Sequence, residues 1–166
     1  MASDKTNALR MLAQHGVACT PHTYDASDGR IDGPSVAVKI GMPAERVYKT
    51  LVTLGASGTP CVFVLPVACA LDRKAAARAV GEKAVDMLRP ADLERVTGYV
   101  RGGCSPVGMK KRFPTVLHSA AQHQPTVVVS AGRIGLQVEL AAADLLRVTG
   151  GVLADIAVES AEGETV

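Results

Sequence analysis

The chain has 166 residues and a mass of 17.2 kDa, which suits one domain with a sizeable buried core. With 48% hydrophobic residues, 20% charged residues and a formal net charge of +2, it is typical of a folded globular protein, which excludes a disordered one. No apolar run approaches the ~20 residues that cross a bilayer, and the N-terminal sequence lacks the apolar core of a secretory signal, so we expect a cytoplasmic protein without a membrane segment.

The first half of the chain predicts short helices and strands in alternation. A helix is expected over residues 7–15, because Thr6 can cap it and Gly16 can end it. A strand over 19–25, a turn-rich loop and a second helix over 35–40 follow, and Pro43 is expected to open a third helix. The segments before and after the turn at 55–59 predict an antiparallel hairpin.

The second half predicts two helices, a long irregular loop, three strands and a closing helix. The helices are expected after Asp72 and Pro90, and the irregular loop over 98–114, which contains four Gly and two Pro. The later elements are expected at residues 115–118, 126–130, 136–140 and 142–150. The sequence therefore predicts an α/β (α+β) fold: a single domain over 1–157, with a mixed, mostly antiparallel sheet that could close into a barrel. An acidic, flexible tail is expected over 158–166.

The segment between Arg95 and Val138 contains basic residues and no Asp or Glu. It either forms a positive face that binds a polyanion through its phosphates or is ordinary solvated surface. With only five aromatic residues, the chain lacks the stacking platform of single-strand binders. If the positive face exists, the residues expected to contact nucleic-acid phosphates are Lys110, Lys111 and Arg112.

Common catalytic and metal-binding motifs are absent from the sequence. There is no dinucleotide-binding, P-loop, zincin or hydrolase-elbow motif. The four cysteines have no zinc-site spacing and are expected to be free thiols, so neither a metal nor a cofactor is predicted.

Three features could nevertheless form a site, and each has a plain structural explanation. The loop 102–108 could offer main-chain N–H groups to a ligand, or be an ordinary surface loop. Residues 130–132 could line a pocket mouth, or form a hairpin turn. Lys49 lies between apolar neighbours, where its ammonium must reach either an anion or water.

Seven segments together resemble the YbaK/EbsC family of free-standing aminoacyl-tRNA editing domains, in particular the branch that deacylates Cys-tRNA(Pro). They occur in the family's order and spacing from residue 6 to about 157. These segments are HTYD at 22–25, VYKTL at 47–51, PVACALD at 66–72, TGYVRGGCSPVG at 97–108, KKRFPT at 110–115, SAGRIGLQVEL at 130–140 and ADL at 143–145.

The resemblance implies a barrel-like sheet with a pocket between VYKTL and the loop at residues 102–108, called the glycine loop below. Lys49 would be the catalytic residue that holds the aminoacyl–adenosine end, and the thiol of the cysteinyl substrate would attack its own ester carbonyl. The implied substrate is Cys-tRNA(Pro), with Cys-tRNA(Cys) as a further candidate, and the implied partner is prolyl-tRNA synthetase. The residues implied to bind the substrate are Tyr24, Thr50, Gly102, Gly103, Cys104, Ser105, Pro106, Ser130 and Gly132.

The sequence departs from the family pattern at three positions. Ala131 stands where glycine is frequent, Gln137 where an acid is frequent, and Cys104 where an aliphatic residue is common. Loop amides and nearby cations could lower the pKa of the Cys104 thiol, but no local pattern supplies a histidine base, so we expect the substrate rather than Cys104 to provide the nucleophile.

Two alternatives remain open at this stage. The same fold could deacylate another mischarged tRNA, such as Ala-tRNA(Pro), with water as the nucleophile. The chain could also be a non-catalytic module that binds tRNA or a synthetase. Neither tRNA selectivity nor oligomeric state follows from the sequence.

Overall fold

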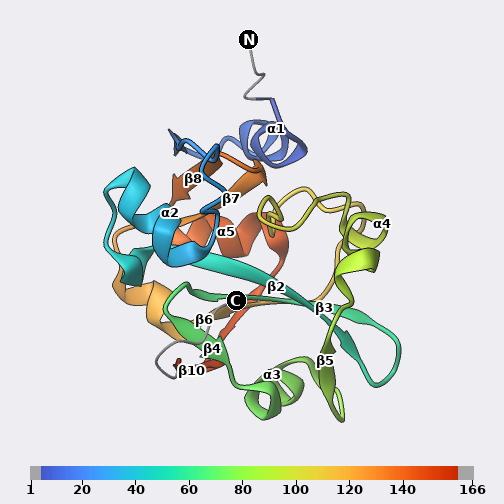
Figure 1. The fold of residues 1–166 in the computed structure, drawn as a ribbon. Coiled ribbons are helices and arrows are strands. Elements are labelled where there is room, and N and C mark those ends of the chain that lie inside the picture. The colour runs from blue at the N-terminus through green and yellow to red at the C-terminus, as the bar shows by residue number, and fades with distance from the viewer. Residues whose placement is uncertain (1–4, 161–166) are drawn as a thin grey trace.

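The computed structural model describes residues 5–160, which form three small sheets surrounded by helices (Figure 1). The helices are α1 Asn7–Gln14, α2 Gly33–Ile40, α3 Arg73–Val80, α4 Leu93–Thr97 and α5 Ala142–Thr149, with 3-10 turns η1 Ala44–Arg46, η2 Pro90–Asp92 and η3 Ser119–His123. The strands are β1 Cys19–Thr23, β2 Tyr48–Gly55, β3 Pro60–Pro66, β4 Cys69–Leu71, β5 Val85–Met87, β6 Thr115–His118, β7 Val127–Arg133, β8 Leu136–Leu140, β9 Val152–Ala154 and β10 Ala157–Glu159.

The largest sheet has the strand order β5-β2-β3-β6-β9. The predicted hairpin is confirmed, because β2 and β3 pair antiparallel from Tyr48↔Pro66 to Leu54↔Pro60. By contrast, β3–β6 and β6–β9 are parallel pairs, so this sheet is mixed. The second sheet, β1-β8-β7, and the pair β10-β4 are antiparallel.

The two larger sheets meet at one corner but do not close into a barrel. A single parallel bridge, Val47↔Val128, joins the start of β2 to β7. Farther along, β5 covers the same edge of β2 only from Thr53 onward. The intervening edge of β2 is left open, and this opening positions the site.

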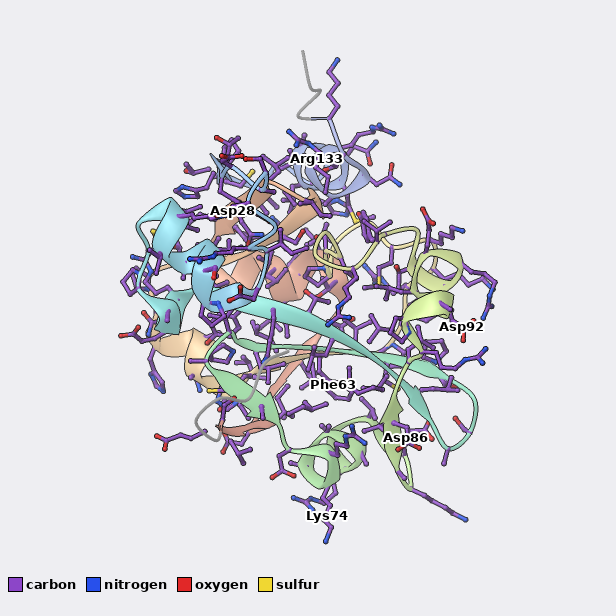
Figure 2. All side chains as sticks on the ribbon, viewed as in Figure 1. Asp28, Phe63, Lys74, Asp86, Asp92 and Arg133 are labelled. Atoms are coloured by element: carbon purple, nitrogen blue, oxygen red, sulfur yellow. The ribbon has the colours of Figure 1, made fainter. Side chains whose placement is uncertain are left out.

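The core explains why β3 is apolar on both faces. Val62 and Val64 lie in the cluster between the two larger sheets, which also buries the inner faces of α1 and α5. The alternate residues Phe63 and Leu65 pack on the other side against the small side chains of α3, such as Ala76. Figure 2 shows Phe63 in the middle of the molecule between the sheet and α3. A strand buried on both faces loses the apolar–polar alternation of a half-exposed one.

Local capping signals predicted the helix ends well. The side chain of Thr6 accepts a hydrogen bond from the Leu9 N–H (3.1 Å), and that of Asp72 accepts one from the Ala75 N–H (3.1 Å), as expected for N-caps. Gly81 ends α3 with a positive φ of 72°.

The sequence predicts that the last helix closes the fold, but two further strands follow it. After α5, the chain adds β9 to the edge of the large sheet and β10 to β4. Strand β10 covers Ala157–Glu159, so Val158 and Glu159, which fall within the segment 158–166 where a tail is expected, pair with β4. Residues 161–166 of that tail lie outside the described residues. Among residues 5–160, no helix has the length and apolar character needed to cross a bilayer.

Candidate active site

A cavity of about 580 Å³ opens where the edge of β2 is uncovered. Its walls come from six segments: the start of α2 with the two residues before it, β2 with the residue before it, Val67 directly after β3, the β5–α4 connection, the glycine loop with Arg101, and one pair of residues on β7 and β8. In Figure 1, β2 crosses the front of the molecule with α2 on one side and α4 on the other. Of the predicted site residues, five line this cavity: Lys49, Thr50, Gly102, Cys104 and Ser130.

Lys49 is held in the wall by β2. It pairs with Leu65 of β3, and its ammonium nitrogen is buried. Burial raises the pKa of the nearby Cys69 thiol on β4, and the positive charge of Lys49 opposes that rise. A cation shielded from water interacts strongly with any anion that enters beside it.

Thr50 lies on the open stretch of the β2 edge. The carbonyl of Val52 accepts a hydrogen bond from the Leu88 N–H (3.0 Å), which identifies the edge toward which Val52 points. Main-chain groups of successive strand residues point to opposite edges, so Thr50, two residues earlier, presents its N–H and C=O to this same edge. Within the described residues no strand pairs with Thr50 there, and a ligand could therefore use those groups.

The glycine loop is packed tightly rather than freely exposed. A Cβ on Gly102, whose φ is +86°, would lie 2.6 Å from Cδ1 of Ile31, and one on Gly103 would lie 2.8 Å from the main-chain nitrogen of Ile134. The Gly103 N–H donates to the Val100 carbonyl (2.9 Å) and is already used in a turn. The main-chain N–H of Gly103 is therefore not available to a ligand, contrary to the expectation for this loop. Gly103 does not line the cavity, whereas Gly102 and Cys104 do.

The rest of the loop divides between the cavity and the interior. Cys104 lines the cavity, but burial raises the pKa of its thiol to about 12, so the expectation that loop amides and cations could lower it is wrong. Ser105 is fully buried, and its Oγ accepts the Val107 N–H (3.2 Å). Pro106 borders a separate, smaller depression. Neither Ser105 nor Pro106 lines the large cavity.

Ser130 and Gln137 form one cross-strand pair of β7 and β8, and both line the cavity. Gln137 is only 6% exposed, so its amide is a polar group inside the fold. Gly132 does not line the cavity; a Cβ there would meet the Tyr99 ring at 3.0 Å. Beside Ser130, the cavity lining therefore contains Gln137 and not Gly132.

Tyr24, expected to line the cavity, lies outside its lining. Its hydroxyl is buried without a hydrogen-bond partner in the described part of the chain, and its ring lies 5.8 Å from the Lys39 ammonium. Lys39 in turn donates to the carbonyls of Asp25 (2.7 Å) and Arg30 (3.0 Å). These contacts fix the loop that leads into the cavity wall at Ile31, so Tyr24 is placed to support that wall.

Comparison with known proteins gives the family. Residues 34–148 match the family described as the aminoacyl-tRNA editing domain. The chain belongs to this family. A protein of Enterococcus faecalis (strain ATCC 700802 / V583), named as a candidate Cys-tRNA(Pro)/Cys-tRNA(Cys) deacylase, EbsC, is 47% identical over 152 residues, which cover 92% of this chain and 93% of that protein.

Solved structures share the fold of this editing domain. The structure of a candidate trans-editing enzyme for prolyl-tRNA synthetase superposes with a TM-score of 0.82 at 22% identity. The match covers 95% of this chain and 99% of the other protein. One of a hypothetical protein, APE2540, gives a TM-score of 0.84 at 21% identity, covering 92% and 100%. At this identity the likeness establishes the fold alone.

The basic run of the editing domain is divided in space. Lys111 and Arg112 line a depression of about 100 Å³ that shares no residue with the large cavity. Lys110 is exposed and donates to the Arg95 carbonyl (3.2 Å). Arg95 itself forms an ion pair with Asp92 (3.1 Å), an acid just outside the acid-free segment. The three predicted phosphate contacts therefore lie away from the cavity.

Two charged residues of the cavity were missed by the sequence predictions. Arg101, directly before the glycine loop, and Asp32, the N-cap of α2, both line it. The sequence could identify Asp32 as a helix N-cap, but it could not show that Asp32 lines the cavity, because that depends on which element packs opposite α2. Within residues 5–160, no three His, Cys, Asp or Glu side chains gather as a metal site would require.

Proposed function

We propose that this editing domain deacylates Cys-tRNA(Pro) in trans, with Cys-tRNA(Cys) as a further substrate. The main support for this proposal is that the cavity contains a buried cation, Lys49, but among its described lining residues no nucleophile paired with a base. No histidine is among its described lining residues, and its one lining cysteine, Cys104, has a strongly raised pKa. A site of this composition suits a substrate that supplies its own nucleophile.

In the proposed reaction the substrate thiol attacks its own ester carbonyl carbon. A C–S bond forms, the bond to the ribose oxygen breaks, and the thiol proton is transferred to that oxygen, so that a thiolactone and free tRNA leave. The proposed role of Lys49 is to stabilise the negative charge that develops on the ester and to hold the terminal nucleotide. Main-chain groups at Thr50, Gly102 and Cys104 orient the carbonyl, and Ser130 lies at the amino-acid side-chain end.

The proposed biological role is error correction. A pocket that accepts proline excludes the similarly sized cysteine only weakly, because small differences in apolar bulk are worth about 1–3 kcal/mol. A second site that removes the error must meet the charged tRNA in the cytoplasm, near prolyl-tRNA synthetase. The name of the E. faecalis relative, which is 47% identical, supports this substrate.

The test compares three substrates on one tRNA: Cys-tRNA(Pro), Ser-tRNA(Pro) and Ala-tRNA(Pro). We expect rapid release of cysteine and very slow release of serine, because a hydroxyl replaces the attacking thiol. Equal rates for all three would show water as the nucleophile, and preferential release of alanine would favour the alternative substrate. Binding of charged tRNA without release of any amino acid would show a non-catalytic module.

A further inference from the structure

We infer that Asp32 binds the α-ammonium group of the aminoacyl ester and thereby selects substrates with a free amine. The inference rests on the proposed function, since it concerns the same cavity. Among the described residues that line this cavity, Asp32 is the one carboxylate, and it shares the lining with two cations, Lys49 and Arg101.

The charge of the substrate requires such a group. The α-amine of an amino acid in ester linkage is largely protonated near neutral pH, given a typical α-amino pKa of about 7.7–8.0. It must enter a cavity that already contains a buried ammonium, and like charges at short range repel. A carboxylate that lines the same cavity offsets this repulsion and gives the ammonium group an acceptor.

The Asp32 carboxylate is held in place before any ligand enters. Its Oδ2 accepts the Ser35 N–H (3.0 Å) and its Oδ1 accepts the Ser35 hydroxyl (2.7 Å). These hydrogen bonds lower its pKa, so the group stays ionised. Each carboxylate oxygen can accept about two hydrogen bonds, so both retain capacity for a donor from the cavity. A fixed acceptor orients a ligand with little further loss of side-chain entropy.

The chain contains a control for the capping role of Asp32. Asp72 also caps a helix, accepting the Ala75 N–H at 3.1 Å at the start of α3, but it does not line the cavity. Asparagine caps helices about as well as aspartate. Asp32→Asn and Asp72→Asn therefore remove one charge each from equivalent caps, and only the first removes it from the cavity wall.

The experiment measures binding of two uncleavable analogues, the cysteinyl amide of 3′-amino-3′-deoxyadenosine and its Nα-acetyl derivative. Wild type and Asp72→Asn should bind the free amine roughly tenfold or more tightly than the acetylated form, the size of effect expected for a charge-assisted hydrogen bond. Asp32→Asn should bind the two within about twofold. Asp32→Ser, also a good N-cap, should behave in the same way and guards against a folding artefact.

The inference is overturned if Asp32→Asn keeps the wild-type preference, or if wild type binds neither analogue. The proposed function is judged separately by release of cysteine from Cys-tRNA(Pro). If the wild-type protein deacylates Cys-tRNA(Pro) but Asp32→Asn still prefers the free-amine analogue, the inference about Asp32 is wrong and the proposed function stands. Absence of deacylation by wild type would sink the proposed function.

Discussion

The glycine loop separates two recesses of different character. On one side, the cavity of about 580 Å³ contains charges of both signs, from Lys49, Arg101 and Asp32. On the other side, the depression of about 100 Å³ is bordered by Lys111 and Arg112, and its described lining has no acid. A basic surface can attract phosphates by charge, whereas a cavity lined by charges of both signs can position an ester that carries an ammonium and a phosphate.

We expect the chemistry to take place in the first recess and the second to attract tRNA by its charge. Residues that are close in the sequence face different recesses, because Gly102 and Cys104 line the large cavity whereas Pro106 and Gly108 border the small depression. Four sets of variants test this division.

The largest expected effect is that of Lys49→Ala. We expect kcat/KM for Cys-tRNA(Pro) to fall about 100-fold or more, as for loss of one charge-stabilising group in a buried site, and Lys49→Arg to restore only part of it. The measurement is single-turnover deacylation, with thermal unfolding to show that the domain is intact. Lys74→Ala, on the exposed face of α3 (Figure 2), is the control and should match wild type. If Lys49→Ala deacylates the substrate at the wild-type rate, Lys49 is not the catalytic residue.

Gly103→Ala should damage the wall between the recesses. Its Cβ would lie 2.8–2.9 Å from main-chain atoms of Arg133 and Ile134, which cannot rotate away, so we expect about 3 kcal/mol lower free energy of unfolding in urea. Gly29→Ala is the control: its φ is +75° but the space around it is open, so the cost should be about 1 kcal/mol. Equal costs would show that the loop can move aside.

Neutralising the small recess should affect tRNA affinity rather than chemistry. In the triple variant Lys110→Ala, Lys111→Ala, Arg112→Ala, the slope of log affinity against log salt should become shallower by about 2–3, because each lost phosphate contact removes roughly one unit. The control removes the same charge from α3, at the exposed Arg73, Lys74 and Arg78. If both triple variants shift the slope equally, net charge alone accounts for binding.

The smallest expected effect is that of Cys104→Ala. The thiol is buried and protonated, and the proposed contribution of this residue is its main chain, so deacylation should stay within about threefold of wild type. Removing the sulfur leaves a small void and should cost about 1 kcal/mol of stability. A trapped cysteinyl-enzyme, or complete loss of turnover in Cys104→Ala, would place the nucleophile on the protein.

Residues near one another in the chain were predicted most reliably. The β2–β3 hairpin, the Ala-rich α3 with its Asp72 cap, and the irregular character of the glycine loop are local properties. The added strands β9 and β10 were missed because their partners, β6 and β4, are far away in the sequence, and a three-residue strand has too few residues to show a period.

Which residues would form the site was predictable only in part. The family resemblance identified Lys49, Thr50 and Ser130, all of which line the cavity. It could not exclude Tyr24 or Gly132, whose orientation depends on packing against Lys39 and Tyr99.

The sequence itself accounted for most of the helices, the β2–β3 hairpin and the family, and it placed Lys49 between apolar neighbours. These follow from hydrophobic periodicity, capping residues and motifs, which act over a few residues. The tertiary structure was needed to show which residues of the glycine loop face the cavity, that Lys111 and Arg112 lie elsewhere, and that Asp32 and Lys49 line the same cavity. The reason is that these placements depend on the open edge of β2 and on close contacts such as that of Gly103 with Ile134, between segments that the sequence does not bring together.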